Sequence, residues 1–194
     1  MHETSVACSN VWAANDSMDD RTLVAAAQAD LQAFEALYQR YFASVYRYLR
    51  ARAQSDEDAA DLTQQVFMQI IAGLPHYRDR GRPFAAWVFR IARNAAIDMQ
   101  RKHRVALAWD LLPESLQQDN REDTEGVILQ GEMRVRLRRL IQELREQDRE
   151  LIVLRFVARL TVAEIAGVVG KSEWAVRKQL TRTLEKLKGS YDVE

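Results

Sequence analysis

The stretch that decides the fold is LTVAEIAGVVGKSEWAVR, residues 160–177. Thr161 and Glu164 have the spacing of a capping box, which starts a helix with two reciprocal hydrogen bonds. Apolar residues then recur at helical spacing up to Gly170, a residue that suits the positive φ of a tight turn between helices. Ser172 is placed to cap a second helix. The pattern predicts a helix-turn-helix near the C-terminal end of the sequence.

The second helix of this pair has a basic face opposite its apolar residues. In a helix-turn-helix the second helix enters the major groove, where arginine can pair with guanine and an amide with adenine. Arg177 is the predicted guanine reader, and Gln179 is an adenine reader if it faces the groove. Lys178 and Arg182 are predicted to bind phosphates. The alternative is an ordinary helical hairpin with a solvated face.

The composition of the 194-residue chain is that of a helical globular protein, with 47% hydrophobic and 29% charged residues and only seven Gly and three Pro. The single cysteine, Cys8, excludes an internal disulfide framework and a cysteine-based zinc cage, and three scattered histidines make no metal set. The sequence shows no signal-peptide pattern and no apolar run of the length that a membrane helix needs. We therefore predict an all-α, cytoplasmic protein without metal or cofactor.

The net charge is zero, but its sign alternates along the chain. Residues 1–20 contain four acidic and no Lys or Arg residues, and residues 21–103 contain twelve basic and eight acidic ones. Residues 104–130 contain two basic and six acidic residues, and residues 131–194 contain fourteen and ten. Two basic blocks on either side of an acidic connector suit two domains that face a polyanion. Helical proteins that bind no polyanion can also show such a distribution.

Apolar periodicity divides the chain into two small helical domains joined by a flexible linker. The first domain is predicted to have helices near 30–50, from Ser55 to Gly73 and over 84–103, with a basic loop at 75–83. The linker can extend about 70–80 Å, roughly 20 base pairs of DNA. The predicted divisions are an acidic disordered tail (1–20), the first domain (21–103), the acidic linker (104–126), the second domain (127–189) and a short tail (190–194).

Several motifs, in this order along the chain, resemble bacterial sigma factors of the sigma-70 family. The motifs are FEALY (34–38), DAADLTQQVF (58–67) and FAAWVFRIARNAAID (84–98) for region 2, and DRELIVLRF (148–156) with residues 160–177 for region 4. Two such blocks with only a short linker between them resemble the extracytoplasmic-function (ECF) group, the smallest of these factors. The resemblance spans roughly residues 21–188.

This resemblance implies a promoter-specificity subunit with no catalytic activity of its own. Such a subunit binds the β and β′ subunits of core RNA polymerase, recognises −10 and −35 promoter elements and helps to initiate transcription of a specific regulon, for instance a stress response. The family also implies an anti-sigma factor as a candidate partner, and no membrane insertion.

The resemblance also assigns three sets of site residues. The helix around 58–72 would dock on the clamp coiled coil of core polymerase, with the set Asp61, Gln64, Gln65 and Met68. The basic loop and the helix after it would melt and read the −10 element, with the set Tyr77, Arg78, Arg80, Arg82, Trp87, Arg90, Arg93, Asn94, Asp98 and Arg101. The −35 set is Ser172, Glu173, Trp174, Arg177, Lys178, Gln179, Thr181 and Arg182.

Within the −10 set, the arginines are expected to bind phosphates, and Tyr77 and Trp87 are candidate stacking surfaces for a flipped base. Trp87 lies one turn after Phe84, so a place in the core is the favoured alternative for this residue. Lys171, Ala175 and Gln179 depart from the residues usual in the family, which leaves the −35 sequence preference open.

Two other function classes compete with the sigma factor. A dimeric helix-turn-helix regulator would need a dimerisation or ligand domain in residues 21–103, where the chain has an arginine-rich loop and helix. A nuclease would use the acidic residues at 56–61, but acidic residues are expected at a helix N-terminus because of the helix dipole. The usual phosphate-binding and metal-binding motifs of enzymes are absent from the sequence.

Overall fold

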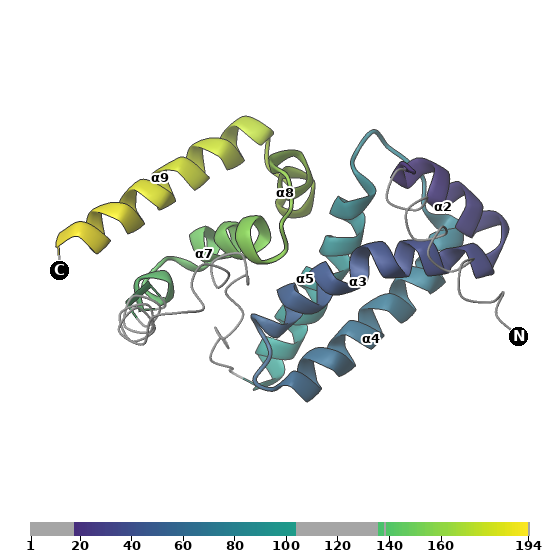
Figure 1. Cartoon of the computed structure of the whole chain (residues 1–194), viewed down its shortest axis with the longest axis horizontal. Coiled ribbons are helices and arrows are strands. Elements are labelled where there is room, and N and C mark those ends of the chain that lie inside the picture. Colours follow the sequence, from purple (N-terminus) through teal and green to yellow (C-terminus); the bar gives the residue numbers. More distant parts are fainter. Residues whose placement is uncertain (1–17, 104–135, 138, 194) are drawn as a thin grey trace, which may run out of the picture.

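The computed structural model describes residues 18–103, 136–137 and 139–193, and helices connected by turns make up this part of the chain (Figure 1). The all-α fold is therefore confirmed, and the described residues contain no strand. The predicted linker (104–126) and all but the last three residues of the predicted N-terminal tail lie outside the described residues.

The first block begins with a helix that the sequence pattern did not reveal, α2 (Asp20–Ala29). The Asp19 carboxylate caps it by accepting a hydrogen bond from the Thr22 amide at 3.0 Å. A single turn of 3₁₀ helix, η1 (Leu31–Ala33), follows, and Asp30 caps this turn. The long helix predicted near 30–50 is α3 (Phe34–Arg50), which buries one apolar face.

Two further helices complete the first block, α4 (Asp56–Gly73) and α5 (Phe84–His103). Ser55 caps α4 as predicted, accepting a hydrogen bond from the Asp58 amide at 3.0 Å. The chain leaves α4 through the 3₁₀ turn η2 (Leu74–His76), which contains a proline. Because α3 packs against both α4 and α5, the three helices enclose a common core.

The second block contains α7 (Glu146–Ile152), a π-helical turn η4 (Val153–Val157), α8 (Val162–Val169) and α9 (Glu173–Val193). The predicted capping box is present, with Thr161 and Glu164 hydrogen bonded in both directions. Gly170 ends α8 with a φ of 70°, as the turn requires. α9 continues to Val193 and so includes residues 190–193 of the predicted tail (190–194).

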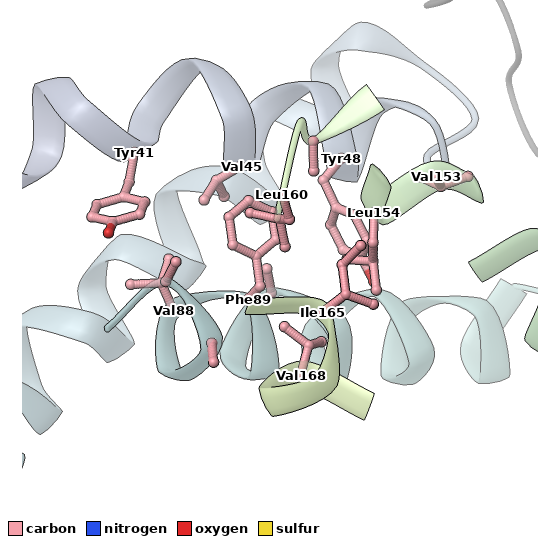
Figure 2. Close-up of a cluster of buried hydrophobic side chains, with 14 of the residues drawn as sticks. Tyr41, Val45, Tyr48, Val88, Phe89, Val153, Leu154, Leu160, Ile165 and Val168 are labelled. Atoms are coloured by element: carbon pink, nitrogen blue, oxygen red, sulfur yellow. The ribbon is translucent and has the colours of Figure 1, made fainter. Parts of the chain in front are cut away.

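The two blocks pack against each other. α8 contacts α5 on one side and α9 on the other, so it lies between these two helices (Figure 1). A second contact between the blocks joins η4 to α3. Figure 2 shows the result: Val45 and Phe89 from the first block meet Leu160, Ile165 and Val168 from the second in one cluster of buried side chains. The hydrophobic core therefore continues from one block into the other.

Candidate nucleic-acid and polymerase interfaces

The basic loop and the start of α5 line a cavity of about 500 Å³. Its described lining contains four arginines and no carboxylate, so the cavity is electropositive. Gly167 of α8 forms part of its wall, which brings the second block to the edge of this site. The lining residues are His76, Tyr77, Arg78, Arg80, Arg82, Pro83, Ala86, Trp87, Arg90 and Gly167.

The aromatic side chains of the cavity belong to a compact cluster. The ring centroids of Tyr77 and Trp87 are 5.1 Å apart, and Phe84 lies 5.1 Å from Tyr77 and 5.3 Å from Trp87. The Trp87 indole also packs on α4, where a Cβ added at Gly73 would come within 3.0 Å of it. Tyr77 and Trp87 are only half-buried, so Trp87 both packs on the core and lines the cavity.

Hydrogen bonds shape the basic loop. Gln28 of α2 donates to the carbonyl oxygens of Leu74 and Tyr77, at 2.8 and 3.0 Å, and so fixes where the loop begins. Asp79 accepts a hydrogen bond from the Gly81 amide at 2.8 Å, and Gly81 has a φ of 74°. These contacts leave Arg80 and Arg82 exposed at the cavity, whereas Arg78 donates back to the Tyr77 carbonyl at 2.9 Å.

The predicted DNA-facing residues of α5 fall into two groups. Arg90, Asn94 and Asp98 are exposed, as is Arg101 near the end of the helix. Arg93 is half-buried, and its Nε lies 3.5 Å from a carboxylate oxygen of Glu150 in α7. The structure therefore brings one predicted phosphate-binding arginine into contact with the second block.

The predicted polymerase-binding residues lie exposed along α4. Asp61, Gln64, Gln65 and Met68 are all exposed, and Met68 retains 62% of its accessible surface. Beside them lies an aromatic patch that we define as Tyr38, Phe42 and Phe67, with ring centroids 4.7 to 6.1 Å apart. Phe67 is buried, but Tyr38 and Phe42 remain 39% and 38% exposed. The sequence pattern predicted the helix near 30–50 but did not identify these two residues as part of a surface.

The predicted −35 residues lie on the first turns of α9. Ser172 caps this helix, accepting a hydrogen bond from the Ala175 amide at 3.2 Å. Trp174 is 69% exposed, and the Lys178 ammonium lies 4.6 Å from the centre of its ring. The exposed members of the set are Ser172, Glu173, Trp174, Arg177, Lys178, Thr181 and Arg182.

Gln179 differs from the rest of the −35 set because it is partly buried and both ends of its side-chain amide are hydrogen bonded within the domain. Its Nε2 donates to the Asp148 carboxylate at 2.7 Å, and its Oε1 accepts a hydrogen bond from Lys171 at 2.8 Å. Burial opposes ionisation of Asp148, but hydrogen bonds from Gln179 and Arg145 outweigh it and hold the pKa of this carboxyl below its usual value. In this structure Gln179 ties α9 to α7.

Sequence reasoning assigned no role to Asp148 or Glu150, although both lie in the DRELIVLRF motif. The signal that could have identified them is their position just before an apolar run. A carboxylate on such a partly buried helix needs a hydrogen-bonding or charged partner. That partner is Gln179 for Asp148, and it is the pair Arg52 and Arg93 for Glu150.

Within the described ranges, no group of three or more His, Cys, Asp or Glu side chains is placed to hold a metal ion. Among the helices described, none combines the length and apolar character needed to cross a bilayer.

Fold and surfaces together define a two-domain, all-helical DNA-binding protein in which one domain is built on a helix-turn-helix. Comparison with known families makes the class specific. Residues 37–105 match the family described as Sigma-70 region 2, and residues 134–187 match Sigma-70, region 4.

Individual relatives agree with this match. The chain is 33% identical to the ECF RNA polymerase sigma factor BldN of Streptomyces coelicolor, over 89% of this chain and 67% of that one. It is also 33% identical to the ECF sigma factor SigD of Mycobacterium tuberculosis, over 87% and 82% of the two chains. Among solved structures it is similar to CnrH in complex with the cytosolic domain of CnrY, with a TM-score of 0.64, 26% identity and coverage of 90% and 98%.

The chain belongs to the ECF group of the sigma-70 family. It is a promoter-specificity subunit of RNA polymerase, and a sigma factor is a non-catalytic subunit of that enzyme. This confirms the family resemblance and favours the sigma factor over the dimeric regulator and the nuclease. The 37–105 and 134–187 matches correspond to the first and second blocks, which we call region 2 and region 4 from here on.

Proposed function

We propose that this sigma factor uses three separate surfaces in transcription initiation. The cavity between the basic loop and α5 takes the −10 element, the first turns of α9 read the −35 element, and the exposed stripe of α4 binds core polymerase. The observation that carries the proposal is the electropositive cavity of region 2, where four arginines surround the half-buried rings of Tyr77 and Trp87.

The cavity suits a base that has left the DNA stack. Unstacking a base costs a few kcal/mol, and stacking on an aromatic ring returns about 1–3 kcal/mol. Tyr77 and Trp87 provide such rings, and the exposed Arg80 and Arg82 are placed to neutralise the phosphates on either side. Because the two terms nearly balance, binding energy can open the promoter without ATP.

The −35 surface suits the major groove. Arg177 and Arg182 are exposed on the face of α9 that is not packed against α8, so they are free to meet DNA. We assign base reading to Arg177 and phosphate binding to Lys178 and Arg182. Gln179 instead fixes the angle of α9 relative to α7 through its hydrogen bond to Asp148.

The α4 surface suits a protein partner. Its polar residues Asp61, Gln64 and Gln65 adjoin the exposed Met68, and the aromatic patch of Tyr38, Phe42 and Phe67 lies close by. Moderately wet interfaces combine apolar and aromatic anchors with a polar rim in this way. We therefore extend the polymerase-binding surface from the α4 stripe to this patch.

We place the protein in the cytoplasm, where polymerase and promoter are found. The similar structure of CnrH is a complex with the cytosolic domain of CnrY. By analogy we propose that an anti-sigma protein is a partner of this chain. The region 2 and region 4 boundaries at 21–103 and 127–189 belong to the same proposal.

Run-off transcription by purified core polymerase on a pool of genomic promoter fragments tests this function. With the chain present we expect discrete new transcripts that share upstream elements. Asp61→Ala should weaken co-elution with core polymerase and reduce the transcripts, whereas Glu185→Ala, which removes an exposed carboxylate of α9 outside the three sets, should do neither. Absence of both transcripts and co-elution would contradict the proposal.

A further inference from the structure

The basic loop of region 2 is attached to α2, a helix that lies before the residues matched to region 2 (37–105). One face of α2 is buried, and the helix packs on α3. The Asp20 carboxylate fixes its N-terminal end there, accepting hydrogen bonds from Arg40 at 2.8 Å and from the Tyr41 hydroxyl at 2.5 Å. α2 is therefore a fixed support, and it also contacts the turn η2, where the basic loop starts (Figure 1).

The side-chain amide of Gln28 joins the two ends of η2. Its nitrogen donates to the carbonyl oxygen of Leu74 at 2.8 Å and to that of Tyr77 at 3.0 Å. An amide nitrogen carries two hydrogens, so both of its donor positions are used. The Leu74 carbonyl also accepts the hydrogen bond that closes the turn, from the Tyr77 amide at 3.1 Å. Gln28 thereby sets the direction in which the chain leaves α4.

The same turn orients the ring of Tyr77. Leu74 is buried and anchors one end of the turn in the core, and Tyr77 is the first residue after the turn. Its ring packs edge-to-face on Phe84, with centroids 5.1 Å apart. Tyr77 also lines two cavities, the electropositive one and a second of about 640 Å³ between α2 and the loop. Because space is open on both sides of this residue, core packing alone does not fix its position.

A second connection between α2 and the loop is weaker. Arg21 forms an ion pair with Asp79 at 2.8 Å, but the two side chains keep 77% and 37% of their surface. Exposed ion pairs contribute little to stability because water and salt screen them. Asp79 is the single acidic residue of the basic loop, so this pairing mainly offsets a negative charge beside Arg80 and Arg82. Of the two connections, the clamp by Gln28 has the larger influence on where the loop lies.

We infer that Gln28 is a positioning residue for −10 recognition: its amide clamps the start of the basic loop and so holds the Tyr77 ring where a flipped base can stack on it. This inference rests on the proposed role of the electropositive cavity. Gln28 is not among the described residues that line this cavity, so it acts through the backbone of Tyr77. Without the clamp, the loop must be ordered when the base binds, and this ordering reduces the net binding energy.

Three substitutions isolate the clamp. Gln28→Met keeps the length of the side chain and a similar helix propensity but removes both donor hydrogens. Gln28→Lys restores a donor of similar reach, because an ammonium group carries three hydrogens. The matched control is Gln39→Met, at an exposed glutamine of α3 whose amide donates to Glu35 in its own helix at 2.8 Å.

Hydrogen exchange in the full-length chain alone measures the clamp directly. We expect the amides of the basic loop to exchange about fivefold faster in Gln28→Met, the change that corresponds to loss of one ordinary hydrogen bond. Gln28→Lys should restore the slower exchange, and Gln39→Met should leave it unchanged. Circular dichroism establishes that each variant remains helical. Exchange at the wild-type rate in Gln28→Met would overturn the inference.

The consequence for −10 recognition is measured with holoenzyme on a promoter fragment selected by the run-off assay. 2-Aminopurine replaces an adenine in or beside the −10 element, and its fluorescence reports unstacking. Gln28→Met should lower the equilibrium constant for opening about fivefold, Gln28→Lys should restore it, and co-elution with core polymerase should stay unchanged. In a Tyr77→Ala background, Gln28→Met should have no further effect, because the clamp acts through Tyr77.

The single variant Tyr77→Ala separates the two ways in which this test can fail. Unchanged opening in Tyr77→Ala overturns the proposed role of the cavity, and the role of Gln28 with it. Reduced opening in Tyr77→Ala together with wild-type opening in Gln28→Met overturns the role of Gln28 alone. A full additional loss when the two substitutions are combined also overturns that role, because Gln28 would then act independently of Tyr77.

Discussion

The two helices that we propose read DNA, α5 and α9, differ in how many of their DNA-facing residues are accessible. On α9, Arg177 and Arg182 are exposed, and the helix packs on α7 and α8 of its own region. On α5, Arg93 pairs with Glu150, and α8 covers the neighbouring face. Both basic helices can be predicted from the sequence equally well. The accessibility of their basic residues cannot, because it depends on contacts between residues that lie far apart in the chain.

The largest expected effect comes from the core that the two regions share. Phe89 is fully buried and packs edge-to-face on Tyr48, with ring centroids 5.6 Å apart. Phe89→Ala should lower the free energy of unfolding by about 3–5 kcal/mol through lost burial and a cavity. Because the core is continuous, amide exchange should quicken in α8 as well as in α3 and α5. Faster exchange confined to region 2 would show that the two regions unfold separately.

A smaller effect is expected at the polar contact that holds α9 in place. Asp148→Asn keeps the shape of the side chain but removes the charge that accepts from Gln179 and Arg145. The free energy of unfolding should fall by about 1.5–3 kcal/mol, the usual worth of a hydrogen bond to a charged group. Chemical denaturation at neutral pH measures this loss.

The Asp148 carboxyl also makes the free energy of unfolding depend on pH, and the direction of this dependence is defined. The pKa of Asp148 is lower in the folded chain than its ordinary value of 3.8, so the folded state binds fewer protons than the unfolded state. The stabilisation is complete above that ordinary pKa and is lost as the pH falls through the folded value. Asp148→Asn should flatten this acid limb of the stability profile, and an unaltered limb would show that other carboxyls cause it.

Local sequence rules predicted most of the helices and their caps. Ser55, Thr161, Glu164 and Gly170 act as expected because each works through its near neighbours in the chain. α2 was missed because its apolar stripe is short and its cap, Asp19, lies in an acidic stretch that resembled a tail.

The covered face of α5 could not be predicted from the sequence. Glu150 lies about one hundred residues from Arg52, and no periodicity links two such positions. The exposure of Tyr38 and Phe42 escaped prediction for a related reason, since apolar spacing alone does not say which face of a helix remains uncovered. The sequence therefore predicted which residues form the candidate sites. It did not predict which residues from distant parts of the chain contact them or leave them exposed.

Sequence-specific DNA binding is expected from Arg177 of α9 but not from the basic loop of region 2. Arg177→Ala should lose about 1–3 kcal/mol of binding at a cognate −35 element and little on scrambled DNA. Arg80→Ala, at an exposed loop arginine of region 2, should instead weaken binding to all sequences equally and reduce its salt dependence. Holoenzyme binding to matched and scrambled promoter fragments, measured at several salt concentrations, distinguishes the two. Equal losses on both DNAs would exclude base reading by Arg177.

The smallest effect concerns the exposed indole of Trp174, which lies one helical turn before Arg177, the residue that we propose reads guanine. Lys178 lies over this ring at 4.6 Å, an arrangement worth about 0.5–1 kcal/mol at an exposed site. Trp174→Ala should thus barely change the free energy of unfolding, because the ring is 69% exposed and packs little. If the ring serves to hold the Lys178 ammonium toward a phosphate, the same substitution should weaken −35 binding, and Trp174→Phe should restore part of it. A loss of stability larger than the loss of DNA binding would instead assign the indole a structural role in region 4.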